Sequence, residues 1–328
     1  MSFDEIHNSY QRAVPFKEFK RLDNYIRYLR IRTIFDPKVS RLKDIKQELS
    51  EFLVEHHIQF PKKVSWETIV GPMREVYERK EDITDEELDD LVRRAYRIYS
   101  ANLEERMDRL IESLREVSEH DEWFENGWRR VRGDRLREFI LKGIKFRSPR
   151  RMITSLEELI RLINNEKIPV AKGWVIISWY DQYSTLIVEH FIKRHEKVVP
   201  TVREMRYANF FVTFGTTYIP MDLKITYIPD GYIKERNLKG VEDALLKVRE
   251  DPLDLARWLY ENQGRTRFDD NNRLYIVVRD WKLKANVKNI EKQVLEYLNK
   301  LEPQQLKKVK WSYDTENYEN ITDVIIIE

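Results

Sequence analysis

The chain has 328 residues, of which 41% are hydrophobic and 35% are charged, and its formal net charge is +2. This balance is typical of a globular protein with a heavily charged surface. It has no cysteine, which excludes disulfides, thiolate metal sites and cysteine nucleophiles. We find neither a bilayer-spanning apolar run nor a signal peptide, so we expect a cytoplasmic protein without a membrane partner.

The first 150 residues predict an almost entirely helical region. Apolar residues recur there at three- and four-residue spacing, and the runs are 23–34, 42–56, 84–98 and 103–114. Thr84 and Glu87 form a capping box that predicts a helix start. The last two runs belong either to one long helix or to two packed helices. We assign 1–150 to DNA recognition or dimerisation, and favour a helix-bundle core over a coiled-coil arm.

After Pro149 the pattern becomes mixed. Strand-like runs at 208–213 and 218–227 flank a short turn, which predicts a β-hairpin. The other predicted elements are helices at 155–168, 174–195, 252–264 and 287–298 and strands at 274–278 and 324–327. We therefore expect a protein of the α+β or α/β class, with an N-terminal helical region and a mixed sheet flanked by helices in 151–328.

A basic segment at 128–151 holds ten Lys or Arg residues against two acids. This local excess of positive charge favours a polyanion such as DNA. The alternative is a solvated helix face followed by a basic loop. The DNA-binding candidates in this segment are Arg129, Arg130, Arg132, Arg135, Arg147, Arg150 and Arg151.

The predicted hairpin carries Asp222 and Lys224 two residues apart, so both side chains project from one face of a strand. The apolar residues between and beside them face the other way and should pack inward. A carboxylate beside an ammonium can bind a cation and hold a water, and oxygen ligands suit Mg²⁺. Taken alone, such a pair is usually a surface ion pair.

The window 174–283 resembles the PD-(D/E)XK superfamily, above all type II restriction-endonuclease-like proteins, with Asp222, Leu223 and Lys224 as the (D/E)XK element. The resemblance implies a nuclease-like core of a helix, a metal-binding hairpin, a second helix and a strand. It also implies a helix glutamate at Glu189 and places Gln263 near the site. The implied metal ligands are Asn209, Asp222, Leu223 and Glu189, the catalytic set adds Lys224 and Gln263, and the implied cofactor is Mg²⁺, with Mn²⁺ as a substitute.

One departure from the family pattern is Asn209, which stands where the first metal-binding aspartate is expected. An amide oxygen can ligate a metal but carries no charge, so metal affinity and water activation should fall. Three explanations remain open: a natural variant that keeps activity, a deliberate inactivating change, or a protein that binds DNA without cutting it. Replacement of the missing carboxylate by Asp181 or Glu204 is less favoured.

The resemblance implies a Mg²⁺-dependent, site-specific deoxyribonuclease that hydrolyses phosphodiester bonds in double-stranded DNA as a homodimer. The alternatives are a structure-specific repair or junction nuclease, a non-catalytic DNA-binding protein, and, least favoured, an interaction protein built on the N-terminal helices. The alternative for Glu189 is an ordinary acid on a helix surface. Arg265, Arg267 and Arg273 either contact phosphates or form a solvated loop.

Overall fold

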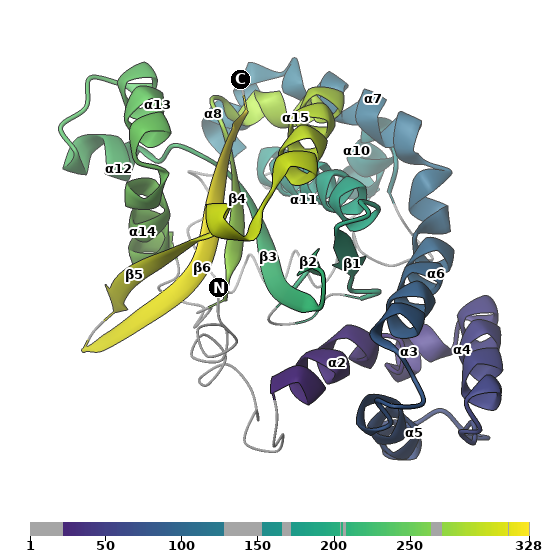
Figure 1. Cartoon of the computed structure of the whole chain (residues 1–328). Helices are drawn as coiled ribbons and strands as arrows, with labels where there is room; N and C mark the ends of the chain where they lie inside the picture. The colour runs from purple at the N-terminus through teal and green to yellow at the C-terminus, as the bar shows by residue number, and fades with distance from the viewer. Residues whose placement is uncertain are drawn as a thin grey trace.

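A computed structural model describes residues 22–127, 153–165, 172–203, 205, 208–263, 271–313 and 315–327. The N-terminal part is helical, as predicted, and its helices curve around one side of the molecule (Figure 1). They are α2 (Leu22–Arg32), α3 (Pro37–Ser40), α4 (Lys43–Glu55), α5 (Trp66–Glu78), α6 (Asp85–Glu104), α7 (Met107–Ser118) and α8 (Asp121–Gly127). None of the helices in the described ranges combines the length and apolar character needed to cross a membrane.

Two helix starts follow the sequence signals closely. At α6 the capping box is confirmed, because the Glu87 N–H donates to Thr84 Oγ1 at 3.2 Å and the Thr84 N–H donates to Glu87 Oε2 at 2.7 Å. The apolar run beyond it divides into two helices, since α6 ends at Glu104 and α7 begins at Met107. At α10 (Leu156–Asn165) the Glu158 N–H donates to the side chain of Ser155 at 3.2 Å.

The described residues contain one six-stranded sheet with the order β1-β2-β3-β4-β6-β5. The strands are β1 (Val198–Pro200), β2 (Phe210–Phe214), β3 (Thr217–Tyr227), β4 (Arg273–Val278), β5 (Lys307–Tyr313) and β6 (Glu316–Ile327). Strands β3, β4 and β6 run parallel, whereas the outer pairs are antiparallel. The expected mixed sheet is therefore confirmed, although β1 and β5 were not predicted and β6 is longer than expected.

Helices cover both faces of the sheet (Figure 1). One face packs against α11 (Lys172–Lys193) and α15 (Val287–Lys300), and the other against α12 (Asp230–Glu235), α13 (Val241–Glu250) and α14 (Pro252–Gln263). Leu223 and Ile225 of β3 belong to the first core, as their alternation with Asp222 and Lys224 predicted. The neighbouring β4 residues Tyr275 and Val277 belong to the second.

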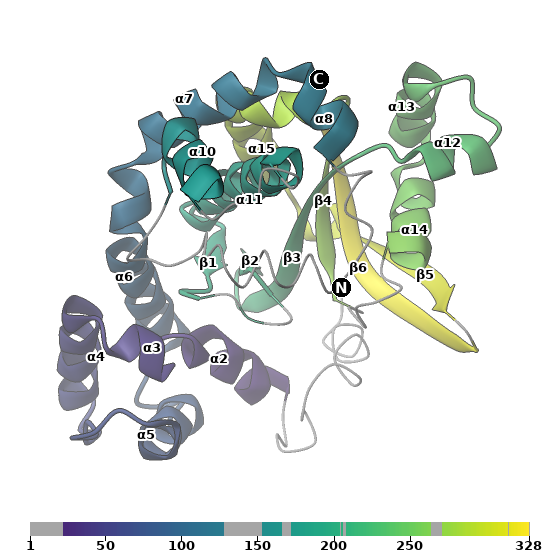
Figure 2. The ribbon, with the colours of Figure 1, turned by 180° about the vertical axis from the view of Figure 1, so that it is seen from behind.

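The helical region and the sheet share the larger hydrophobic core, which includes residues from Tyr25 to Ile327. From behind, α7, α8 and α10 lie against α11, which itself packs on the sheet (Figure 2). Burial of apolar surface between these segments is the main favourable contribution to holding them together. The helical region therefore packs against the sheet and helps to stabilise it.

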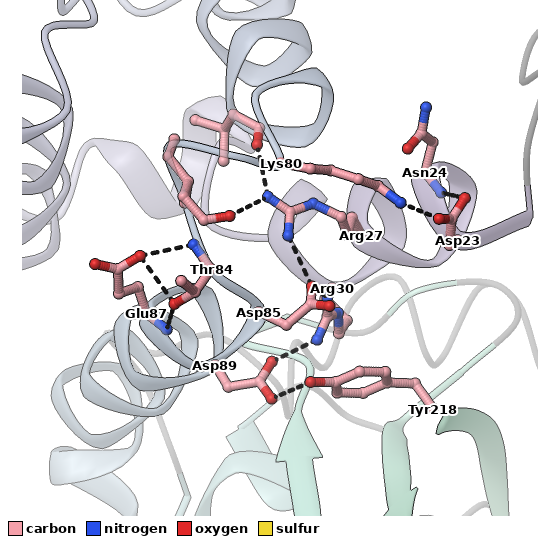
Figure 3. A network of polar contacts seen from close by, with 12 residues as sticks. Asp23, Asn24, Arg27, Arg30, Lys80, Thr84, Asp85, Glu87, Asp89 and Tyr218 are labelled. Atoms are coloured by element: carbon pink, nitrogen blue, oxygen red, sulfur yellow. Dashed lines mark hydrogen bonds and ion pairs between the residues drawn. The ribbon is translucent and has the colours of Figure 1, made fainter. Parts of the chain in front are cut away.

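A buried polar network also joins the helical region to β3 (Figure 3). Arg27 and Arg30 of α2 both donate to Asp85, and Arg30 Nη1 donates to Asp89 at 2.8 Å. The hydroxyl of Tyr218 on β3 donates to the same Asp89 at 2.7 Å. The Arg30 guanidinium also lies 3.6 Å from the centroid of the Tyr218 ring. One arginine thus links α2, α6 and β3.

The pKa values of the two carboxylates in this network are shifted in opposite directions. Burial raises the pKa of Asp85, but the adjacent guanidinium groups of Arg30 and Arg27 lower it by more, so its pKa lies below the ordinary value. For Asp89, burial dominates over Arg30 and Tyr218, and its pKa is raised. Asp85 is therefore the carboxylate whose charge stabilises the fold.

We predict that Asp85→Asn lowers the free energy of unfolding by about 1–2 kcal/mol, because it leaves two buried guanidinium groups with less compensating charge, while the 41% exposure of Asp85 lets water screen part of the loss. Since folding lowers the pKa of Asp85, its contribution is present above the unfolded pKa and disappears as the pH falls through the folded value. Urea unfolding at pH 7 and at pH 3 should show a large difference from wild type at pH 7 and a smaller one at pH 3.

The matched control is Asp90→Asn on the same helix, where an exposed carboxylate pairs with Arg94 at 3.0 Å. It should change the free energy of unfolding by less than about 0.5 kcal/mol. Equal effects of the two substitutions would contradict a special role for the buried network.

Candidate functional site

Strands β2 and β3 form the predicted hairpin, with pairing from Phe210↔Met221 to Phe214↔Thr217. At the turn, Gly215 has a φ of 59°, in the left-handed region that residues with a side chain adopt only with strain. The sequence signal of aromatic and β-branched runs around a glycine turn therefore located this element correctly.

Asn209 lies directly before β2 and contacts the residues on both sides of Asp222. Its N–H donates to the Met221 carbonyl at 2.8 Å, and its Oδ1 accepts from the Leu223 N–H at 2.9 Å. The structure therefore places Asn209 against the two residues that flank Asp222. The amide oxygen also has a structural role, because it takes the place of a backbone acceptor for the Leu223 N–H just before β2 begins.

Asp222 and Lys224 lie on the α14 side of the sheet, beside Arg273 and Tyr275 of the neighbouring parallel strand. Lys224 is exposed, whereas Asp222 is partly buried. Arg273 Nε lies 3.4 Å from Asp222 Oδ2, and the Arg273 guanidinium lies 5.1 Å from the centroid of the Tyr260 ring. Only 8% of Arg273 is exposed. The hypothesis that Arg273 belongs to a solvated loop is therefore wrong, because it begins a buried strand.

Glu189 approaches the hairpin from the other face of the sheet, since it lies on α11. It is buried, so the alternative of an ordinary surface acid is wrong, and its Oε1 lies 2.6 Å from Lys193 Nζ. Lys193 also donates to the Thr201 carbonyl at 3.0 Å, and the Thr201 N–H and hydroxyl both donate to the Asn209 carbonyl. Lys193 and Thr201 thus connect Glu189 to the backbone carbonyl of Asn209.

His190, next to Glu189, lies in a buried polar cluster between α6 and α11. Its Nδ1 is 3.0 Å from the Tyr96 hydroxyl and its Nε2 is 3.5 Å from Glu104 Oε1. Burial lowers the pKa of His190 to about 4, although the Glu104 carboxylate opposes this shift. Arg194 and Lys193 lower the pKa further, while Glu189 raises it. The imidazole is therefore neutral at physiological pH.

Lys284, another buried cation, pairs with the middle of α11. Its Nζ donates to Asp181 Oδ1 at 2.5 Å and to the Ile225 carbonyl at 3.3 Å, and it lies 3.8 Å from the centroid of the Trp281 ring. Burial lowers the pKa of Lys284, with Asp181 acting in the opposite direction. Asp181 is therefore paired with a lysine, and sequence reasoning missed Lys284 because no local pattern marks it.

The remaining predicted residues are Gln263 and a set outside the described ranges. Gln263 is the last residue of α14. Three residues earlier, the Tyr260 hydroxyl donates to the Asn271 carbonyl at 2.8 Å, so the end of α14 lies near the start of β4. The predicted residues outside the described ranges are Arg129, Arg130, Arg132, Arg135, Arg147, Arg150, Arg151, Glu204, Arg265 and Arg267.

The donor chemistry at the hairpin fits one hard cation held by the Asp222 carboxylate and the adjacent Asn209 amide oxygen. Each oxygen already has a protein partner but retains further lone-pair capacity. Within the described ranges, no group of three or more histidine or acidic side chains is arranged to hold a metal ion. These residues would therefore bind such an ion weakly.

Comparison with models of known protein families found no match, and searches among curated proteins and solved structures also found none.

We predict that the stability of the fold decreases between pH 6.5 and pH 4 through protonation of His190. Because folding lowers the pKa of this residue, its contribution is present above the ordinary value of 6.5 and is lost as the pH falls toward 4. Thermal unfolding across this range should show that His190→Gln removes about 2 kcal/mol of the pH dependence.

His120→Gln is the control, since His120 is exposed on the surface beside Glu122. The control should retain the wild-type pH dependence. If His190→Gln retains it as well, the buried imidazole is not responsible.

Proposed function

We propose that the protein is a Mg²⁺-dependent, site-specific endonuclease for double-stranded DNA, of the PD-(D/E)XK type II restriction class. The main supporting observation is that Asn209 lies beside Asp222 while Lys224 projects from the same strand face. The order of α11, the β2–β3 hairpin, the α12–α14 helices and β4 agrees with the core that the resemblance implies.

In this proposal, Asp222 and Asn209 hold the cation, with the Leu223 carbonyl as a third oxygen donor. Glu189 lies on the other face of the sheet, paired with Lys193, so this proposal does not place it among the ligands. When bound, Mg²⁺ would stabilise negative charge on the scissile phosphate and lower the pKa of a bound water. Lys224 Nζ, which is exposed on the same face, would donate a hydrogen bond to the attacking water and orient it.

We predict that Asn209→Asp strengthens Mg²⁺ binding by at least about tenfold and increases DNA cleavage, because a second carboxylate adds charge beside Asp222. An aspartate can accept the same hydrogen bond from the Leu223 N–H, so the hairpin should remain intact. Cleavage of a mixed-sequence plasmid over a Mg²⁺ titration measures the effect.

Two control variants accompany this experiment. Asp222→Asn in the Asn209→Asp background should abolish both gains, because it again leaves one carboxylate. Lys224→Ala should slow cleavage while leaving Mg²⁺ affinity nearly unchanged. Cleavage of branched DNA but not of linear duplex would favour a structure-specific nuclease on the same core.

A second candidate is a non-catalytic DNA-binding protein with the same fold. It is favoured by the protein contacts of every expected metal-binding side chain: Asn209 with Leu223, Asp222 with Arg273, and Glu189 with Lys193. Tight, salt-sensitive DNA binding without cleavage, persisting in a folded Asn209→Asp variant, would support this candidate and contradict the nuclease proposal.

The proposed DNA contacts include the basic segment 128–151, on the basis of its charge. We predict that replacing Arg129, Arg130 and Arg132 by alanine weakens binding of all duplexes and reduces the salt slope by about one for each lost phosphate contact. Titrations at several salt concentrations measure this. An unchanged slope would remove the segment from the interface.

We further propose that the protein acts on DNA inside the cell and as a homodimer, because two strands must be cut. Sedimentation of the protein with a duplex containing its target would measure the number of chains on each DNA molecule. A single bound chain that still cuts both strands would contradict the dimer.

A further inference from the structure

Arg273 occupies a central position beside the hairpin site. Asp222, Arg273 and Thr322 are neighbours on three adjacent parallel strands, so their side chains form one row on the α14 face. Thr322 Oγ1 donates to the Arg273 carbonyl at 2.9 Å, and Tyr260 of α14 lies against the guanidinium. The arginine is thus held by the sheet below and by a helix above.

Among the described residues, Arg273 is a cation that pairs with Asp222 in this row. Of Asp222 and Asn209, only Asp222 carries a charge, and Asp222 Oδ2 lies 3.4 Å from Arg273 Nε. A guanidinium does not lose its charge at any physiological pH. A divalent ion that approaches Asp222 therefore meets a carboxylate whose charge is already compensated, and it must displace or repel Arg273 in order to bind.

We infer that the Arg273 guanidinium competes with the divalent metal for Asp222 and binds the scissile phosphate of DNA. The inference rests on the proposed nuclease function and adds a residue to it. The planar guanidinium presents paired N–H donors that match two oxygens of a phosphate. When the metal takes Asp222, the released guanidinium can bind the phosphate instead, so metal and DNA binding are coupled through one side chain.

The test compares Mn²⁺ binding to the full chain, followed by electron paramagnetic resonance without DNA, in wild type, Arg273→Gln and Arg273→Lys. Arg273→Gln should bind Mn²⁺ about tenfold more tightly, because removal of an adjacent cation restores the full charge of Asp222. Arg273→Lys retains the charge and should stay within about twofold of wild type. Unchanged Mn²⁺ affinity in a folded Arg273→Gln variant would overturn the inference.

The matched control is Arg279→Gln, at the other end of β4, where an exposed arginine pairs with Glu242 at 2.5 Å. It should leave Mn²⁺ affinity unchanged. An equal gain in this variant would show only a general effect of lower positive charge, and would also count against the inference.

A DNA titration at saturating Mn²⁺, with a short duplex that is not cut, tests the phosphate contact separately, because the metal must hold Asp222 for Arg273 to be released. Both Arg273 variants should bind this duplex several-fold more weakly than wild type, because neither glutamine nor lysine can form the two parallel hydrogen bonds that a guanidinium makes to a phosphate. If Arg273→Gln does not fold, Arg273→Lys decides, since unchanged DNA affinity in that variant overturns the inference. The Mn²⁺ measurement needs neither DNA nor cleavage, so its result remains distinct from failure of the nuclease proposal.

Discussion

Strand β2 pairs with only part of one edge of β3, so the backbone N–H and carbonyl groups of β3 beyond that part need other hydrogen-bond partners. This constraint shapes the candidate site. Pairing with β2 ends at Met221, and beyond it two side chains supply hydrogen-bond partners to the edge. Asn209 accepts from the Leu223 N–H and Lys284 donates to the Ile225 carbonyl. Buried backbone groups without partners are costly. The residue proposed as a metal ligand is therefore also part of the sheet.

Three acids around the hairpin share a second feature, which is that each has a basic partner, on the same helix, on a neighbouring strand or in a short 3-10 helix. Asp222 pairs with Arg273, Glu189 with Lys193, and Asp181 with Lys284. Partial burial strengthens such pairs and makes an isolated charge costly. Under the proposed function, a metal ion would therefore have to compete with ammonium or guanidinium groups, and its affinity would depend on the positions of nearby basic side chains.

The helical region is connected to this site through β3. The Arg30 guanidinium pairs with Asp85 and Asp89, and Asp89 accepts from Tyr218, four residues before Asp222 on the same strand. The shared hydrophobic core reinforces this connection. The position of the hairpin therefore depends on residues more than one hundred positions earlier in the chain, and changes in α2 or α6 can alter the site without touching it.

Local signals in the sequence were sufficient to predict the hairpin, the capping box at Thr84, the buried strand at 274–278 and the common face of Asp222 and Lys224. Each depends on residues a few positions apart, where strand alternation or helix capping acts directly. The burial of Arg273, the Glu189–Lys193 pair beside Asn209 and the contacts of Lys284 were decided by tertiary structure. They depend on which distant segments pack together, as does β5, whose lysine-rich sequence becomes a strand by pairing with β6.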